Sequence, residues 1–392
     1  MSAPTLFPLA MSPLPEPSAA AAAHSQQLVQ RIQQDIAAAG GWVSFARFME
    51  LALYAPGLGY YAAGARKFGA AGDFVTAPEM TPLFGQALAR QLAQIMAASA
   101  PQILEAGAGT GRLAADLLLA LEAMQALPER YLILELSADL KERQRETLAQ
   151  AAPHLLARVE WLERLPERFS GAIVGNEVLD AMPVHLVVWR EAGLLERGVS
   201  LHHGQFVWAE QAASERLADH ARQLGEFPPG YQSEIALAAP AWAAAWGSIL
   251  ETGAAVLIDY GFPRREFYHP QRTGGTLMCH YRHFAHPDPF YLPGLQDITA
   301  HVDFTAIIIA ADAAGLGLGG YTSQGQFLLN CGILDRLAEI PADSLDYVRA
   351  AGAVNKLVMP HEMGELFKVM ALTKGMDAPL LGFTQGEQSF RL

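Results

Sequence analysis

The sequence predicts an α/β fold with a doubly wound, mostly parallel sheet. From residue 101 onward, short apolar runs alternate with stretches of helical spacing, and this alternation is typical of a sheet that helices cover on both faces. Three glycines, Gly107, Gly109 and Gly111, follow the first apolar run, and a helical pattern begins directly after them. A strand, a glycine turn and a helix in this order predict a ligand-binding edge, because a helix N-terminus presents free backbone N–H groups.

Apolar runs predict the strands of this sheet, and three- and four-residue spacing predicts its helices. The strands are expected at residues 103–105, 131–135, 159–162, 171–175, 254–259, 317–322 and 367–372. The helices are expected at residues 112–124, around Leu140 and Leu148, and at residues 235–250, 304–314 and 324–337.

The remaining segments predict additions to this unit. Residues 1–24 are rich in proline and alanine and are expected to be a disordered tail without a signal peptide. Residues 25–98 are expected to form an N-terminal helical extension that covers the glycine turn. Residues 99–392 are expected to form the main domain, with a β-hairpin insertion at about 184–232 and a second insertion at about 261–302, where glycine, proline, histidine and aromatic residues are frequent.

Composition limits the classes of partner. A formal net charge of −13 argues against a nucleic-acid partner, since phosphate binding depends on Lys and Arg. No apolar stretch reaches the roughly 20 residues of a membrane span, so we expect a soluble protein without membrane insertion. The two cysteines, Cys279 and Cys331, are too few for a disulfide framework, which favours the cytosol. The oligomeric state stays open, and a homodimer is one option.

The glycine spacing discriminates between two classes of cofactor. A dinucleotide turn, Gly-x-Gly-x-x-Gly, would need its third glycine where this chain has Arg112, so an oxidoreductase is disfavoured. The pattern Gly-x-Gly-x-Gly with an acid two residues earlier resembles the first motif of S-adenosyl-L-methionine-dependent methyltransferases. The residues expected to hold S-adenosyl-L-methionine from this motif are Glu105, Gly107, Ala108, Gly109 and Gly111.

Further candidate cofactor ligands follow the next strand. Glu135 ends that strand, and an acid in this place accepts hydrogen bonds from both ribose hydroxyls in doubly wound nucleotide sites. Leu136 is expected beside the cofactor as well. The alternative is that Glu135 only caps the next helix.

The fourth strand ends in a second polar group, Asn176, Glu177 and Asp180. If this segment enters a helix, Glu177 and Asp180 lie three residues apart on one face and could converge on a cation. A guanidinium fits such a pair because it is planar, carries several donors and stays charged. We therefore expect these three residues to be catalytic, by orienting the acceptor nitrogen. The alternative is that both acids cap a helix start.

Several segments in order resemble the MidA family of methyltransferases, which is related to a mitochondrial complex I assembly factor. They include Glu-Ala-Gly-Ala-Gly-Thr-Gly at residues 105–111, Gly-Asn-Glu-Val-Leu-Asp-Ala-Met-Pro-Val at residues 175–184 and Ile-Asp-Tyr-Gly at residues 258–261. Residues 72–85 and 296–304 are similar to the family too. The likeness covers the chain from about residue 26 to its end.

This resemblance implies a seven-stranded methyltransferase fold, S-adenosyl-L-methionine as the cofactor and protein arginine as the acceptor. In the mitochondrial relative, the acceptor is an arginine of a respiratory complex I subunit. We therefore expect a protein-arginine N-methyltransferase linked to complex I or to a similar protein target. By the same analogy, Asp73 and Thr76 close over the cofactor, with Glu79 as a further polar candidate. A non-catalytic assembly chaperone with a cofactor-stabilised fold is the alternative function.

Histidines within the second insertion offer two interpretations. His301 precedes a predicted helix at the ligand-binding edge and could relay the proton that an arginine loses. Asp303 is either a second site residue or the cap of that helix. His280, His283 and His286 lack the spacing of a helical ligand pair, so we expect no metal site.

Overall fold

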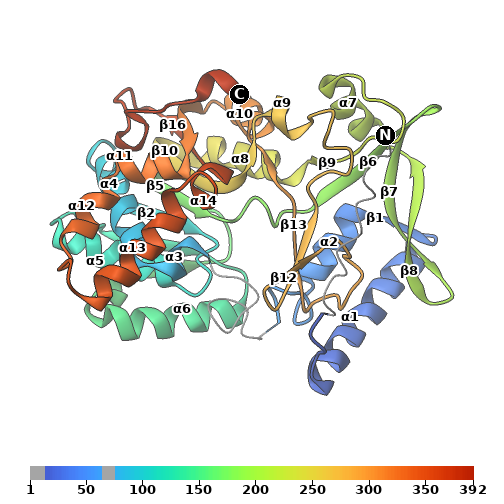
Figure 1. Cartoon of the computed structure of the whole chain (residues 1–392), viewed down its shortest axis with the longest axis horizontal. Helices are drawn as coiled ribbons and strands as arrows, with labels where there is room; N and C mark the ends of the chain where they lie inside the picture. Colours follow the sequence, from blue (N-terminus) through green and yellow to red (C-terminus); the bar gives the residue numbers. More distant parts are fainter. Residues whose placement is uncertain (1–13, 64–75) are drawn as a thin grey trace, which may run out of the picture.

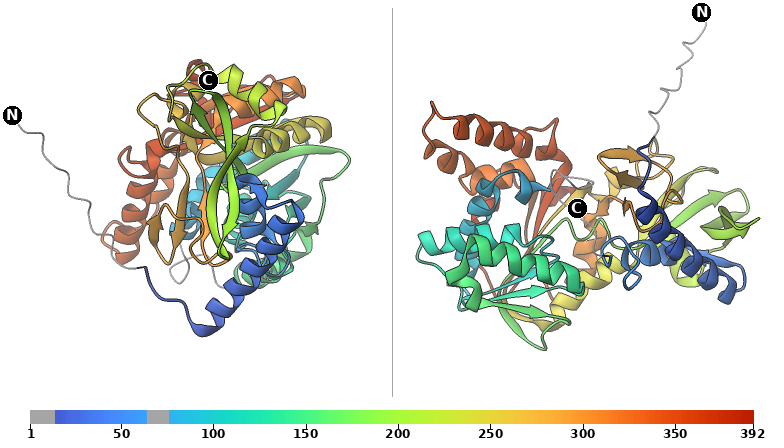
Figure 2. Two further views of the ribbon diagram at one scale, coloured as in Figure 1. Left: turned by 90° about the vertical axis from the view of Figure 1, so that its right-hand side faces the viewer. Right: turned by 90° about the horizontal axis from the view of Figure 1, so that it is seen from below.

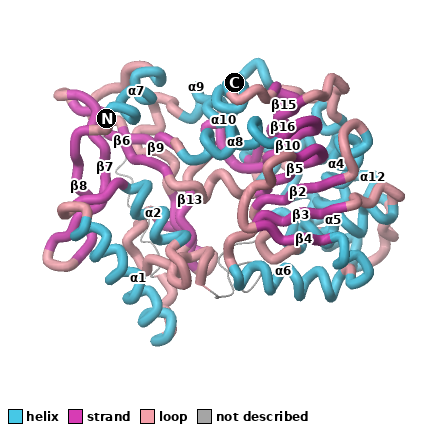
Figure 3. The backbone as a smooth tube through the Cα atoms, turned by 180° about the vertical axis from the view of Figure 1, so that it is seen from behind, coloured by secondary structure: helices cyan, strands magenta, loops and turns pink. Residues whose placement is uncertain are grey.

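The computed structural model describes residues 14–63 and 76–392. Its largest sheet has eight strands, and seven of them follow the order β15-β16-β10-β5-β2-β3-β4 (Figures 1 and 3). Their bounds are β2 Gln102–Ala106, β3 Arg130–Leu134, β4 Val159–Leu162, β5 Phe169–Asn176, β10 Leu250–Phe262, β15 Gly317–Ser323 and β16 Phe367–Lys374. The eighth strand is β14 (Val302–Asp303), which pairs with β10.

The predicted α/β class with a mostly parallel sheet is confirmed. Strands β4, β3, β2, β5 and β10 run parallel, whereas β16 and β15 are antiparallel to their neighbours. The sheet has one strand more than the seven expected. The additional strand, β14, has only two residues and is too short to be recognised as an apolar run in the sequence. Parallel strands place their carboxyl ends at one edge, so the polar residues that follow β2, β3 and β5 lie together.

Helices cover both faces of this sheet (Figure 3). One face carries α4 (Pro82–Ala97), α5 (Arg112–Ala123), α6 (Ala138–Ala151), α11 (Gln324–Asn330), α12 (Ile333–Ala338) and α13 (Leu345–Val358), and the other carries α8 (Ala238–Ile249) and α10 (Phe304–Ala313). Successive strand residues alternate between the two cores: Ile103 packs in the first and Leu104 in the second, both fully buried. Strands buried on both faces read as continuous apolar runs, which is why the sequence identified them.

The first predicted insertion is larger than a hairpin. Strands β6 (Val184–Arg190), β7 (Gly193–His202), β8 (Gln205–Ala212) and β9 (Gln232–Ala236) form an antiparallel sheet, with α7 (Glu215–Leu224) between β8 and β9. Strand β1 (Trp42–Ser44) adds to β7, so the N-terminal segment is built into this second sheet. Helices α1 (Ala19–Ala38) and α2 (Phe45–Tyr54) pack beside it (Figure 2).

The second predicted insertion contains a third sheet, for which no strands were predicted. It consists of β11 (Met278–Tyr281), β12 (Phe284–His286) and β13 (Asp297–Thr299). Cys279 of β11 faces Ile298 of β13, and both are buried against α2. This packing fixes residues 297–301 relative to the N-terminal helices. The segment also contains α9 (Arg264–Phe267).

Part of the segment that was predicted to be a disordered tail is helical. Residues 19–24 belong to α1, because Ser18 caps the helix by accepting the backbone N–H of Ala21 at 3.2 Å. Residues 1–13 lie outside the described part of the chain. Among the described residues, no helix combines the length and apolar character that crossing a bilayer requires.

Candidate active site

The glycine turn between β2 and α5 adopts a left-handed backbone at all three glycines. The φ angles are 69° at Gly107, 52° at Gly109 and 84° at Gly111, a region that side chains disfavour. A Cβ on Gly109 would meet no atom within 4 Å, whereas a Cβ on Gly111 would lie 2.9 Å from the Cα of Gln144. Gly109 is therefore open to a ligand, and Gly111 is needed for the close approach of α6.

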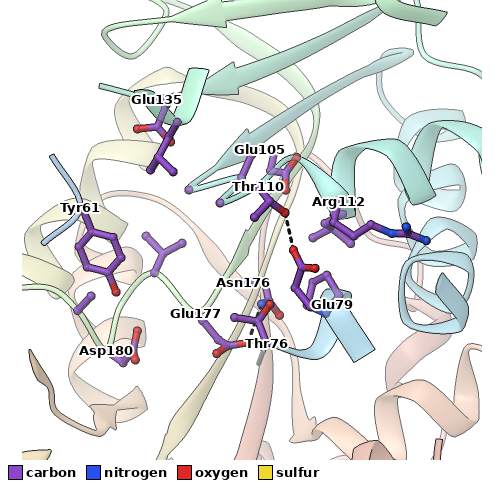
Figure 4. A pocket seen from close by; sticks show the side chains of 18 of the residues that line it. Tyr61, Thr76, Glu79, Glu105, Thr110, Arg112, Glu135, Asn176, Glu177 and Asp180 are labelled. Carbon is purple, nitrogen blue, oxygen red and sulfur yellow. Dashed lines mark hydrogen bonds between the residues drawn. The ribbon is translucent and has the colours of Figure 1, made fainter. Parts of the chain in front are cut away.

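A cavity, named here the first cavity, lies over this turn (Figure 4). The predicted site residues that line it are Thr76, Glu105, Gly107, Ala108, Gly109, Glu135, Asn176, Glu177 and Asp180. Four predicted residues are placed otherwise. Gly111 and Leu136 do not belong to its lining, and Leu136 is 76% exposed. His301 lines a second cavity, and Asp73 lies outside the described residues.

Glu135 is held in place by Gln144 of α6. Gln144 Nε2 donates to Glu135 Oε2 at 3.0 Å and to the carbonyl oxygen of Gly109 at 3.1 Å. Trp161 Nε1 donates to Gln144 Oε1 at 2.9 Å, which orients this amide. Ser137 is the N-cap of α6, and its own backbone N–H donates to Glu135 Oε1 at 2.8 Å. Burial raises the pKa of Glu135, and its position leaves it available as an acceptor for a ligand.

Glu105 is a buried acid at the end of β2. Tyr131 donates its hydroxyl to Glu105 Oε2 at 2.7 Å, and burial raises the pKa of Glu105 to about 7. Thr110 of the glycine turn donates a hydrogen bond to Glu79 of α3 (Ala77–Met80), as Figure 4 shows. The turn is thus fixed from the sheet side and from the segment that precedes α4.

Glu177 and Asp180 lie on a turn and not in a helix, so the helical arrangement considered for them is not the one observed. Glu177 has a φ of 52°, and the backbone N–H groups of Val178, Leu179 and Asp180 all donate to Asp259 Oδ2, at 3.1, 2.8 and 3.2 Å. Asp259, on β10, takes the place of the carbonyl acceptors that a helix would offer. Neither acid caps a helix, because residues 177–183 contain none.

The two acids form a pair in which Asp180 is buried and Glu177 is half-buried. Burial, followed by repulsion from Asp180, raises the pKa of Glu177 to about 8, and burial raises the pKa of Asp180 to about 6. Asn176 Nδ2 donates to Glu177 Oε1 at 3.0 Å, and Tyr260 hydrogen-bonds Asp180. Asn176 Oδ1 and Asp180 Oδ1 are buried without a hydrogen-bond partner in the described part of the chain. Unpaired buried acceptors are costly, so the site fits a ligand with N–H donors and positive charge.

The N-terminal segment supplies a wall of this cavity that sequence reasoning missed. Tyr54 and Tyr61 line the first cavity, and their rings stack at 5.6 Å. Tyr61 donates its hydroxyl to the carboxylate of Asp297, at 3.0 Å from both oxygens, and Tyr54 donates to the carbonyl oxygen of Ala181 at 2.9 Å. These pairs join residues more than a hundred positions apart, and no local pattern announces them.

The second cavity adjoins the first at three shared residues, Glu177, Asp180 and Asp297. His301 lines the second cavity, where burial, followed by the nearby charge of Arg272, lowers its pKa to about 4. Two ligands, one in each cavity, would therefore meet at these three shared acids.

Two further predictions concern Asp303 and the histidines of the second insertion. Asp303 caps α10, because its Oδ1 accepts the backbone N–H of Ala306 at 3.1 Å, so the capping alternative is confirmed. In the described ranges, no group of three or more His, Cys, Asp or Glu side chains is arranged to hold a metal ion.

Curated relatives cover most of the chain. The protein arginine methyltransferase NDUFAF7 of Danio rerio is 28% identical, over 89% of this chain and 90% of its own. The Mus musculus protein of the same name is 29% identical, over 85% of this chain and 81% of its own. Both are named as mitochondrial proteins, and so is the Drosophila melanogaster homologue. The expectation of a cytosolic location is therefore wrong: composition and cysteine content carry no information about the organelle.

A solved structure is more similar still. A protein of Burkholderia thailandensis with bound S-adenosyl-homocysteine is 52% identical, with a TM-score of 0.94 over 97% of this chain and 100% of that chain. In addition, residues 87–322 match the profile of a family of S-adenosyl-L-methionine-dependent methyltransferases. The chain therefore belongs to the MidA family of S-adenosyl-L-methionine-dependent methyltransferases, as the order of its motifs predicted.

Proposed function

We propose that this enzyme transfers a methyl group from S-adenosyl-L-methionine to the side chain of an arginine in a protein substrate. The observation that carries the proposal is the pair of acids, Glu177 and Asp180, at the junction of two cavities. A guanidinium in the second cavity would find two carboxylates there. The names of the NDUFAF7 relatives, protein arginine methyltransferases, support the same acceptor.

The first cavity fits the cofactor. Glu135 would accept the ribose hydroxyls, Gly109 would let the ligand lie against the backbone, and the unpaired Oδ1 of Asn176 would accept from the ammonium group. Glu105 and Thr76 complete the polar lining. When bound, the cofactor supplies a methyl group on a positively charged sulfur. Gly111 and Gln144 act indirectly, by holding α6 and Glu135 in place.

Glu177 and Asp180 are proposed to bind and orient the guanidinium, which then presents one nitrogen to the first cavity. The raised pKa of Glu177, about 8, means that the empty site holds a proton near neutral pH. A bound cation favours the ionised acid and expels this proton. Since a pKa of about 4 makes His301 a weaker base than Glu177, we assign proton acceptance after transfer to Glu177 and keep His301 in the cavity wall.

The domain organisation follows from the same proposal. Residues 99–392 would form the methyltransferase domain, and residues 25–98 would cover the cofactor. The insertions at about 184–232 and 261–302 would form the side that receives the protein substrate. By family resemblance, subunits of respiratory complex I are the first acceptors to examine.

The experiment is a comparison of Glu177→Gln with the unchanged protein. Calorimetry should show S-adenosyl-homocysteine binding in both, while mass spectrometry of methylarginines in deletion cells should show that only the unchanged protein restores them. Glu196→Gln is the matched control, since Glu196 is buried but lines neither cavity. Loss of cofactor binding in Glu177→Gln would contradict the division of roles. Full complementation of deletion cells by this variant would favour the chaperone alternative.

A further inference from the structure

The second cavity combines the two surfaces that an arginine side chain needs. At the junction with the first cavity it has the carboxylates of Glu177, Asp180 and Asp297. Its apolar lining comes from the third sheet and from the region of α14 (Met363–Leu366), and consists of Met278, Met363, Leu366 and Phe367. Apolar walls suit the methylene stem of a long side chain, while the acids suit its charged head.

His301 gives this cavity a neutral polar wall. Its Nδ1 is buried and has no hydrogen-bond partner among residues 14–63 and 76–392. The ring packs edge-on against Tyr260 and Phe262, each at 5.1 Å between centroids. Arg272 also lines the cavity, but its guanidinium is held over Phe262 at 4.2 Å and donates to backbone carbonyls. A neutral imidazole can accept one N–H from a ligand and does not repel a cation.

The position of this wall is set from outside the cavity, by Glu234 of β9. Glu234 Oε1 accepts the backbone N–H groups of Thr276 and Leu277 at 2.8 and 2.9 Å, and its Oε2 accepts the hydroxyl of Thr276 at 3.2 Å. The same hydroxyl accepts the backbone N–H of His301 at 3.1 Å. Thr276 and His301 line the second cavity, whereas Glu234 is 1% exposed and lines neither cavity.

The loop that Glu234 holds is shaped for this contact. Gly275 has a φ of 77°, and a Cβ on it would lie 2.3 Å from Glu234 Oε1. Only glycine therefore allows the backbone to come this close to the carboxylate. The second sheet is thus connected to the wall of the second cavity through one buried side chain.

We propose that the second cavity is the binding subsite for the acceptor arginine and that Glu234 is a positioning residue, which holds Thr276 and His301 in the wall of that subsite. The proposal rests on the proposed function, arginine methylation. A guanidinium offers five N–H donors in a plane, whereas an ammonium offers three on a point charge. A wall with fixed hydrogen-bond acceptors around the acids therefore selects arginine over lysine. Glu234 holds Thr276 and His301 of that wall in position.

The test measures binding of small acceptor analogues to the full chain saturated with S-adenosyl-homocysteine. The probes are Nα-acetyl-arginine N-methylamide and its lysine counterpart, titrated by calorimetry. The unchanged protein should bind the arginine probe more tightly than the lysine probe. Glu234→Ala should weaken binding of the arginine probe by about tenfold, as expected for the loss of a fixed hydrogen-bonded wall. Its affinity for S-adenosyl-homocysteine should stay unchanged.

Glu196→Ala is the matched control. Glu196 is a buried acid of the same sheet, on β7, and its partner is His185, whose Nδ1 lies 2.6 Å from Glu196 Oε1. This variant should lose stability and keep the affinity for the arginine probe. Glu234→Gln is the conservative variant, because its amide oxygen can still accept from the backbone of Thr276 and Leu277, and it should recover part of the affinity.

Three outcomes would overturn the proposal: equal affinity for the two probes, no binding of the arginine probe to the unchanged protein, or equal losses in Glu234→Ala and Glu196→Ala. The last outcome would show a structural role alone. Loss of S-adenosyl-homocysteine binding would reveal that Glu234→Ala does not fold. In that case the same comparison of affinities for the arginine probe is made with Glu234→Gln in its place. Transfer to protein arginine by the unchanged enzyme is measured separately, so the inference about Glu234 can fail while the proposed function stands.

Discussion

Asp259 accepts the backbone N–H of Asp180 at 3.2 Å, on the same oxygen that accepts the N–H groups of the two preceding residues. One carboxylate on β10 therefore shapes the turn that carries Glu177 and Asp180, the two residues proposed to bind the acceptor guanidinium. In Asp259→Asn, an amide must face either these three donors or the N–H of Tyr260. We expect a loss of about 2 kcal/mol in the free energy of unfolding and loss of methyl transfer, measured by denaturant titration and by methylarginine formation.

Asp303→Asn is the control for this prediction. Asp303 is also a buried acid that accepts a backbone N–H, at the start of α10, but it lines neither cavity. It should lower stability and leave transfer per folded molecule unchanged. Equal transfer by the Asp259 and Asp303 variants would contradict the role assigned to Asp259.

Gln144→Ala should weaken cofactor binding, although Gln144 does not line the first cavity. The amide of Gln144 joins Glu135 to the carbonyl of Gly109, so its loss frees both groups. We expect the affinity for S-adenosyl-homocysteine to fall by about tenfold, the effect of roughly one lost hydrogen bond. Calorimetry measures this affinity. Gln91→Ala is matched to it, because Gln91 is equally buried and bonds to the backbone of Gly382; an equal fall there would point to general loosening.

Gly109→Ala should reduce cofactor binding, and Gly204→Ala is its control. Gly109 and Gly204 both have left-handed backbones, with φ of 52° and 76°, and a Cβ on either would meet no atom within 4 Å. Each alanine variant should therefore lose about 1 kcal/mol of stability. Only Gly109 lines the first cavity, so only Gly109→Ala should lose S-adenosyl-homocysteine affinity. Similar affinities of the two variants would remove Gly109 from the site.

The raised pKa of Glu177 predicts a pH dependence of stability. Its ordinary value is 4.5, and burial followed by repulsion from Asp180 raises it to about 8. Between these values the folded protein keeps a proton that the unfolded chain has released, so the free energy of unfolding should fall as pH rises. Glu177→Gln removes this contribution. The variant should gain stability relative to the unchanged protein from about pH 4.5 to about pH 8, by urea titration; a constant difference would refute the assigned pKa.

Local patterns predicted the parts of the site that lie on one strand and the turn after it. Gly109 and Glu135 were identified because a strand end, a glycine turn and a helix start are adjacent in sequence. Their placement together follows from β2 and β3 being parallel neighbours. The same reasoning failed at Glu177, where a distant acid on β10 replaced helical hydrogen bonds.

The walls contributed by other segments could not be predicted from spacing. Tyr61 reaches Asp297 only because the third sheet packs on the N-terminal helices. Glu234 reaches Thr276 only because β9 lies beside the second insertion. Such pairs depend on how separate layers dock, and one sequence contains no periodic signal for docking.

The junction of the two cavities has a consequence for repeated transfer. Beyond the acids Glu177, Asp180 and Asp297, the two cavities have different walls. With the cofactor assigned to the first cavity and the acceptor arginine to the second, as proposed above, spent cofactor could leave from its own side while the acceptor side chain stays bound on the other. Under that proposed assignment, a second methyl group could be added to the same residue within one encounter with the substrate.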